Sequence, residues 1–304
     1  MNFVQLANLA INGLVEGAVI ALPALALTLV MGIARFPNAA TGDWMTLGAY
    51  AAVGAQAALI GTGMGTGTGL AGAAPMVLAT LAAAVVCAGL SIAAYELIFK
   101  RLSRSAMVAS LLASIGLAFL VRSLITLALG HEQRTFALPL MRAANYGGVR
   151  VLPADLAIAA VALVVLACVF AWLRFGRSGR LLRALADNPE LARLSGIRSQ
   201  RLMWLLWALA GALSAIGGVL LGVKSVVMPE LGWELLLPAF AAMVLGGIGS
   251  PVGAVVGALL TGVVQELSVP LVGPSYKIAV AFALLLLTLL LRPAGLFGRP
   301  EQVR

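Results

Sequence analysis

Long apolar runs separated by short polar stretches occupy most of this chain. The hydrocarbon core of a bilayer takes about 20 helical residues to cross, and a backbone in lipid must satisfy its own hydrogen bonds, so each run predicts a helix. Apolar residues make up 62% of the 304 residues and charged residues 10%, far below the roughly 25% of soluble domains. The sequence therefore predicts an all-α fold, a polytopic transmembrane helical bundle in one domain, residues 1–304, with about eight or nine spans.

Two interruptions fall inside the apolar sequence. The predicted spans are 11–33, 44–60, 75–98, 107–129, 153–173, 202–222, 252–268 and 276–291, with a broken or re-entrant segment at 238–249. The interruptions lie at 35–43 and 246–251. Irregular backbone at membrane depth is tolerated only when it is buried in protein or lines a watery cavity, and a broken segment in each half is typical of transporters. Candidate translocation-pathway residues are Glu16, Asn38, Thr41, Asp43, Gly246, Gly247 and Gly249.

Charged residues inside spans are costly, so each needs an interpretation. Glu16 either lines a pathway or lies at the membrane interface, and Glu266 is expected at the interface. Glu96 precedes Lys100 by four residues, a spacing that favours an ion pair along one helix. Arg122 is expected to extend its long side chain to the external surface.

Small residues in the spans also carry a packing signal. Gly249, Gly253 and Gly257 form two consecutive Gly-x-x-x-Gly steps, which let a helix approach closely, either within the chain or from a partner subunit. Cys87 and Cys168 lie in apolar runs and are interpreted as small core residues rather than a disulfide.

Several kinds of site are excluded by what the sequence lacks. None of its Lys residues stands in a Gly-x-x-x-x-Gly-Lys-Ser/Thr phosphate loop, and His131 is the one histidine, so no histidine metal site is expected. No catalytic residue, metal ligand or cofactor is therefore assigned, and the chain is not expected to be an enzyme. The net charge of +9 comes from Arg residues at the ends of apolar runs, so no nucleic-acid partner is expected.

A polar island at 174–201 separates two long spans. It holds seven of the chain's 20 Lys and Arg residues, and the bias of such residues toward cytoplasmic loops predicts that it lies inside. Asp187-Asn188-Pro189 is expected to end one short helix and cap a second that begins at Pro189. The same bias predicts an external N-terminus and a cytoplasmic C-terminus.

Four separated blocks then give the chain a family resemblance. They are 17–32, continuing through Asn38 and Gly42 to Met45 and 48–50; Leu111–Leu117; Leu182–Ile197; and Ala239–Ala254, followed by Arg292–Gly298. Taken in this order, they resemble the permease subunits of branched-chain amino acid ABC importers. The family typically has Phe-Ala-His-Gly-Glu after the asparagine, whereas this chain has Ala39-Ala-Thr-Gly-Asp43. The resemblance therefore leaves branched-chain amino acids, other amino acids, amides and urea open as substrates.

The resemblance implies a set of partners and a role for the polar island. It implies a bacterial inner-membrane permease that works with a second, similar or identical permease, ATPase subunits that bind the ATP, an extracytoplasmic binding protein and membrane lipid. The ATPase-coupling residues it implies are Arg183, Ala186, Asp187, Asn188, Pro189, Glu190, Arg193 and Gly196.

Other classes remain open from the residues alone. A self-sufficient channel or ion-coupled carrier for a small solute is the main alternative, and a non-transporting scaffold is another. A carrier would not require an island of the form found at 174–201, and a scaffold would not need two broken segments. In the simplest interpretation of that island, its Arg residues only fix the topology.

Overall fold

The structure is a computed structural model that describes residues 3–62, 70–102, 106–138, 144–146 and 149–298. Its helices are α1 (Phe3–Ala34), α2 (Thr41–Gly61), α3 (Leu70–Ala94), the π-helical η1 (Tyr95–Phe99), α4 (Lys100–Leu102), α5 (Met107–Leu129), α6 (Pro153–Phe175), α7 (Arg177–Asp187), α8 (Pro189–Leu194), α9 (Ser199–Lys224), α10 (Leu231–Gly246), α11 (Pro251–Val272), the 3-10 turn η2 (Pro274–Tyr276) and α12 (Lys277–Leu291). One antiparallel hairpin, β1 (Ala144–Tyr146) and β2 (Val149–Val151), accompanies them. The all-α bundle is confirmed, with this hairpin as an addition.

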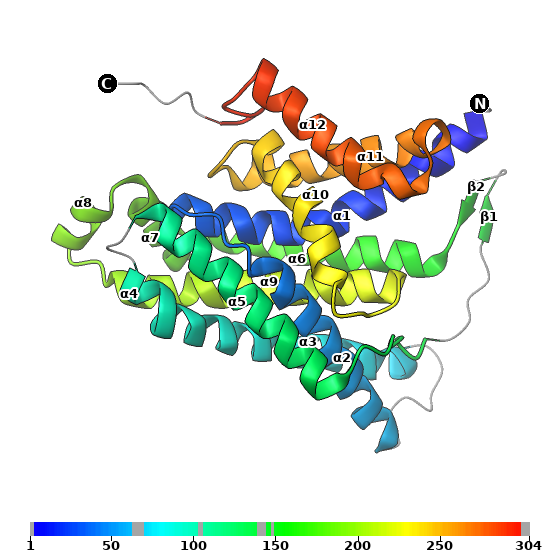
Figure 1. The fold of residues 1–304 in the computed structure, drawn as a ribbon, viewed down its shortest axis with the longest axis horizontal. Helices are drawn as coiled ribbons and strands as arrows, with labels where there is room; N and C mark the ends of the chain where they lie inside the picture. The colour runs from blue at the N-terminus through cyan, green and yellow to red at the C-terminus, as the bar shows by residue number, and fades with distance from the viewer. Residues whose placement is uncertain (1–2, 63–69, 103–105, 139–143, 147–148, 299–304) are drawn as a thin grey trace.

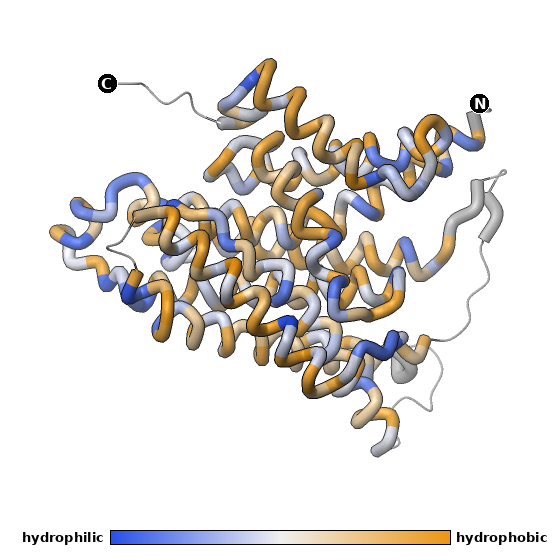
Figure 2. Tube along the Cα trace, in the orientation of Figure 1, coloured by the Kyte–Doolittle hydropathy of each residue, from blue (hydrophilic) through white to orange (hydrophobic). Residues whose placement is uncertain are grey.

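Seven helices of the described chain are long and apolar enough to cross a membrane. The 21-residue α2 and the 16-residue α10 are two further apolar helices. In Figure 1, α1, α6 and α9 run along the long axis, while α7 and α8 lie at one end and the hairpin and N-terminus at the other. Figure 2 shows hydrophilic residues gathered at the α7–α8 end and apolar residues along the long helices. The protein is a multi-pass membrane protein.

Helix α1 forms the centre of the bundle. A run of its residues from Val19 to Leu27 is buried, and the helix packs against α6, α9, α10 and α11. Its closest neighbour is α11, because a Cβ atom on Gly13 would lie 2.6 Å from the Val263 Cα, and one on Gly17 would lie 2.7 Å from the Leu259 Cα. Small residues therefore bring the two backbones into direct contact.

The second interruption is a sharp turn rather than a long broken segment. The segment predicted as broken at 238–249 is wrong in extent, since α10 continues through Pro238 to Gly246. The chain then turns through Gly247 and Gly249, whose φ angles of 106° and 82° suit glycine. Ser250 caps α11 by accepting a hydrogen bond from the Gly253 amide at 3.2 Å.

The glycine steps serve packing within the chain. Gly253 lies against the backbone of Gly246, and Gly257 lies against the Ala242 carbonyl. These contacts hold α10 against α11 just after the turn. Gly253 and Gly257 therefore serve helix packing within the chain rather than contact with a partner subunit.

The two cysteines have different environments. Cys87 is buried on α3, whereas Cys168 is exposed on α6, and both are free thiols. The prediction that both are core residues is therefore wrong for Cys168. Its helix is apolar on every side, so hydropathy did not reveal which face is covered.

Candidate functional site

The polar island folds into the two short helices that its sequence predicts. The side-chain oxygen of Asn188 accepts hydrogen bonds from the Glu190 amide at 3.1 Å and the Leu191 amide at 3.0 Å. This caps α8, whose first residue is Pro189. The predicted junction at Asp187–Pro189 is confirmed.

Helix α7 lies back against the end of α6. Leu182 and Leu185 are buried, and a Cβ atom on Gly179 would lie 2.6 Å from the Leu173 Cα. The Arg183 guanidinium donates to the Arg174 carbonyl at 3.4 Å. The apolar face of α7 is thus held on the bundle while its basic face stays outside.

Helix α8 presents apolar side chains to the exterior. Leu191 is 60% exposed and Leu194 is 86% exposed, beside the exposed Glu190 and Arg193. Gly196 ends the helix with a φ of 76°, and the Ile197 amide bonds back to the Ala192 carbonyl at 3.1 Å. An apolar pair within a charged, exposed turn is a surface suited to a protein partner.

The implied coupling residues lie together on this one surface. Arg183, Asp187, Asn188, Glu190, Arg193 and Gly196 are exposed, and Ala186 and Pro189 are partly buried. A cavity of about 1100 Å³ lies beside them, bounded by α7, the end of α1, α6 and the α10–α11 turn. The residues that line this cavity include Arg183, Ala186 and Asp187 of α7 and Gly249 of the turn. The structure thereby connects α7 to the second interruption, which the sequence did not show.

The other two glycines of that interruption have packing positions. Gly246 faces the Gly253 backbone, and a Cβ atom on Gly247 would lie 2.8 Å from the Gly298 Cα. Neither glycine lines the cavity.

The first interruption is buried in the bundle. Asn38 accepts a hydrogen bond from the Ala40 amide at 3.2 Å, and the Ala39 amide donates to the Ser114 hydroxyl of α5 at 3.1 Å. Asn38, Thr41 and Asp43 are all buried. Phe36, Asn38 and Ala40 are thus covered by protein, as irregular backbone at membrane depth requires, whereas Arg35 at the start of the interruption is exposed.

Arg122 pairs with the buried carboxylate of Asp43. Its Nε lies 3.0 Å from Oδ1 and its Nη2 lies 3.3 Å from Oδ2. The Arg122 guanidinium also lies over the Trp233 and Phe119 rings, 5.1 and 5.6 Å from their centroids. The prediction that Arg122 reaches the external surface is wrong, because a buried partner from another helix holds it. Sequence reasoning missed this pair, because its members lie 79 residues apart.

The first turns of α2 and α10 meet beside this ion pair. The Gly232 amide donates to the Thr46 hydroxyl at 3.0 Å, and a Cβ atom on Gly42 would lie 2.8 Å from the Gly232 carbonyl oxygen. Two helix starts, a buried ion pair and the first interruption therefore form one junction.

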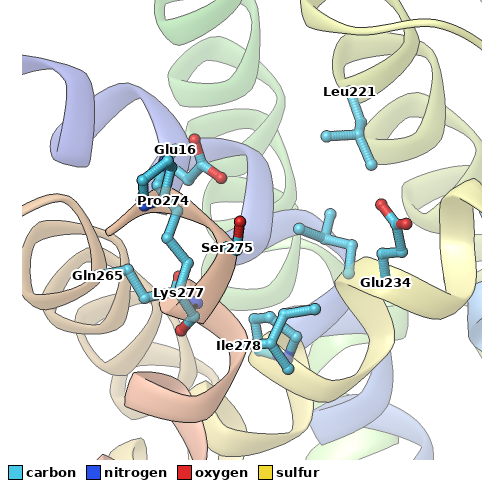
Figure 3. Close-up of a pocket in the computed structure, with 10 residues that line it drawn as sticks. Glu16, Leu221, Glu234, Gln265, Pro274, Ser275, Lys277 and Ile278 are labelled. Atoms are coloured by element: carbon cyan, nitrogen blue, oxygen red, sulfur yellow. Dashed lines mark hydrogen bonds between the residues drawn. The ribbon is translucent and has the colours of Figure 1, made fainter. Parts of the chain in front are cut away.

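Two more ion pairs lie at the end opposite α7 and α8. Glu16 pairs with Lys224 at 2.6 Å, and Glu266, which is 7% exposed, pairs with Lys277 at 2.5 Å. Glu16, Gln265 and Lys277 line a pocket of about 210 Å³, shown in Figure 3. Glu16 is thus both paired and at a pocket. The interface assigned to Glu266 stays a prediction.

Glu96 belongs to the opposite end. It pairs with Lys100 at 2.7 Å, which confirms the predicted ion pair. It also accepts hydrogen bonds from Gln200 and Trp204 of α9.

In the described part of the chain, no group of three or more His, Cys, Asp and Glu residues is arranged to hold a metal ion.

Comparison with known proteins gives consistent matches. The family described as "Branched-chain amino acid transport system / permease component" matches residues 9–289. The chain is 31% identical to the high-affinity branched-chain amino acid transport system permease protein LivH of Escherichia coli K12, over 95% of this chain and 94% of that protein. It is 32% identical to the corresponding permease protein BraD of Pseudomonas aeruginosa, over 96% of this chain and 95% of that protein. No solved structure gives a significant match.

Proposed function

Because the chain belongs to the family of permease components of branched-chain amino acid transport systems, we propose that it is the permease subunit of an ABC importer for branched-chain or related amino acids. The observation that carries this proposal is the α7–α8 surface. It is a pair of short helices in which α8 is capped by Asn188 and exposes Leu191 and Leu194, and it adjoins a cavity that reaches the α10–α11 turn.

The proposed mechanism follows from that geometry. ATPase subunits bind α8 and move with ATP binding and hydrolysis. Because Leu182 and Leu185 fix α7 to the bundle, a movement of α8 is passed to α7 and changes the shape of the cavity that α7 and the turn at Gly249 both line. The chain supplies the path and the coupling surface, with no catalytic residue or cofactor of its own, and ATP is bound by its partners.

The proposed setting is a bacterial inner membrane with α7 and α8 in the cytoplasm. The α7–α8 end collects the Arg residues of the island, and α4, which holds Lys100 and Arg101, lies at the same end in Figure 1. The end of α1 that precedes Arg35 lines the cavity beside α7. Such basic residues favour the cytoplasmic side. This orientation puts the N-terminus outside and the C-terminus inside. A second permease and an extracytoplasmic binding protein complete the proposed importer.

Purification tests the proposed assembly. The tagged chain, extracted in mild detergent, is expected to retain ATPase subunits and a second permease, which mass spectrometry identifies. The reconstituted complex with its binding protein is expected to import L-leucine or L-valine only with ATP. Recovery of the chain alone in several mild detergents, with solute uptake that needs no ATP, would instead establish a self-sufficient channel or carrier.

A charge reversal on α8 tests the coupling surface. Glu190→Lys is expected to lose ATP-driven uptake while the variant inserts and purifies at wild-type yield, since Glu190 is exposed. Glu132→Lys, an exposed reversal outside α8, is the matched control. Equal uptake by wild type and Glu190→Lys would remove the coupling role.

A further inference from the structure

The pocket at the end opposite α7 and α8 is built by five helices and the η2 turn. Glu16 comes from α1, Leu221 from α9, Glu234 from α10, Gln265 from α11 and Lys277 from α12. Its volume of about 210 Å³ is below the range of drug-sized sites and suits a small solute. In the view of Figure 3, Glu234 lies on one side and Glu16 and Lys277 lie on the other, with Ser275 between them.

The charges around this pocket are unevenly satisfied. Glu16 is paired with Lys224, and Glu266 is paired with Lys277. Glu234 is exposed, and its carboxylate makes no hydrogen bond or ion pair with any described residue, so it is open to a ligand that arrives from solvent. Because Lys277 has three N–H donors, its bond to Glu266 leaves donors free for an anionic group. The pocket thus offers an unpaired carboxylate and an ammonium group with spare donors.

The rest of the lining is mostly apolar, with Gln265 and Ser275 as its polar members. Leu221, Leu235, Pro238 and Ile278 cover the space between the charged groups. A free carboxylate, a positive group and an aliphatic wall match the ammonium, carboxylate and side chain of an aliphatic amino acid.

We propose that this pocket is a recognition site for a zwitterionic aliphatic amino acid. Glu234 accepts hydrogen bonds from the α-ammonium group, Lys277 donates to the α-carboxylate, and the aliphatic wall receives the side chain. The inference rests on the proposed function and adds a substrate-recognition site within the permease itself.

Glu234 lies in the first turn of α10, which also contacts the residues around the Asp43–Arg122 ion pair. The preceding residue, Trp233, lies 5.1 Å from the Arg122 guanidinium, and Gly232 bonds to Thr46 of α2. The first turn of α10 therefore joins the pocket to the junction at Asp43. A ligand held by Glu234 acts on the same turn that contacts the buried ion pair.

Glu234→Gln tests the site because it removes the charge and keeps the size. Glu230→Gln is the matched control, since Glu230 is exposed one turn earlier and lies outside the pocket. The assembled importer, with its ATPases, partner permease and binding protein, is reconstituted in liposomes. Loss of a charge-assisted hydrogen bond is expected to lower the maximal rate of L-leucine uptake about tenfold in Glu234→Gln. The Glu230→Gln rate is expected to stay at the wild-type value, and Glu234→Asp is expected to restore a substantial rate.

A binding measurement separates recognition from other roles. Saturation-transfer NMR on the complex without binding protein is expected to detect L-leucine in wild type and Glu230→Gln and to lose it in Glu234→Gln. The analogue 4-methylpentanoate, which lacks the ammonium group, is expected to show no difference between wild type and Glu234→Gln.

Three results would overturn the site. The first is an uptake rate in Glu234→Gln equal to that of wild type. The second is an equal loss of NMR signal for L-leucine and 4-methylpentanoate in Glu234→Gln. The third is a wild-type maximal rate in Glu234→Gln that needs a higher concentration of binding protein for half-maximal uptake. The last result would assign Glu234 to docking of the binding protein.

Uptake by the wild-type importer separates the failure of the site from the failure of the proposed function. Its absence would defeat the proposed function, whereas normal wild-type uptake with an unaffected variant would defeat only the site.

Discussion

The Arg122 guanidinium holds the Asp43 carboxylate through two hydrogen bonds, 3.0 and 3.3 Å long. Asp43 lies in the first turn of α2, where the helix dipole also favours a negative charge. The Asp43 side chain is 1% exposed and that of Arg122 is 17% exposed. The pair therefore ties α5 to the start of α2 inside the bundle, where the Asp43 carboxylate has no access to water and depends on Arg122 as its partner.

Removing one charge of this pair is expected to destabilise the protein strongly. Asp43→Asn leaves the Arg122 cation without a counter-charge, a loss of about 3–5 kcal/mol for a buried pair. The measurement is thermal unfolding of the purified variant in detergent. Asp43→Asn is expected to melt well below wild type.

A double variant and a surface pair provide the controls. Asp43→Asn combined with Arg122→Met is expected to recover part of the lost stability, because no uncompensated charge remains. Glu96→Gln, which breaks a partly exposed pair, is expected to cost about 0–1 kcal/mol. Equal melting temperatures for wild type and Asp43→Asn would contradict a structural role for the pair.

Close packing of α2 on α9 depends on Gly48. A Cβ atom there would lie 2.5 Å from the Ala215 Cα, so Gly48→Ala forces the helices apart at a cost of about 1–3 kcal/mol. Gly54→Ala on the same helix meets nothing within 4 Å and is the matched control. The stability of both variants is measured in detergent. A destabilised Gly48→Ala beside an unaffected Gly54→Ala is the expected result.

The cap at Asn188 predicts a local effect on coupling. Asn188→Ala removes the acceptor of the Glu190 and Leu191 amides and is expected to destabilise α8 by about 1 kcal/mol. The number of substrate molecules imported per ATP hydrolysed is expected to fall, with no change in the melting of the bundle. Asn188→Ser keeps a capping oxygen and is expected to retain coupling. Loss of coupling in both variants would show that the cap is not the cause.

The end of α8 depends on the left-handed backbone of Gly196. Its φ is 76° and the space around it is open, so strain rather than a clash opposes a side chain there. Gly196→Val is expected to reduce uptake more than Gly196→Asn, because asparagine tolerates this conformation. Gly196→Asp is expected to uncouple transport, since it adds a negative charge to the proposed ATPase-binding surface. Equal uptake in all three variants would contradict a need for this turn.

Local features of the fold were predictable from the sequence. The capped junction at Asn188 and the Glu96–Lys100 pair follow from short-range rules about helix ends and four-residue spacing. The positions of the two interruptions also follow, because charged residues, glycine and proline stand out against apolar runs. The extent of α10 did not follow, since Pro238 sits within the helix rather than ending it.

The side-by-side placement of helices was not predictable. Leu163 and Leu166 of α6 have the same hydropathy, yet one is 54% exposed and the other 3% exposed. Residues that face lipid and residues that face protein are equally apolar, so hydropathy does not identify the buried face of a span. The same limit applies to the exposure of Cys168.

By itself, the sequence determined that the chain is a bundle of membrane helices with two interruptions and one structured polar island, because these features depend on span length and local backbone chemistry. Only the tertiary structure decided that Asp43 meets Arg122, that α7 and the turn at Gly249 line one cavity, and that Glu234 faces a pocket shared with Lys277. These relationships depend on which helices are neighbours, and that choice is made by close packing at small residues and by the need of each buried charge for a partner.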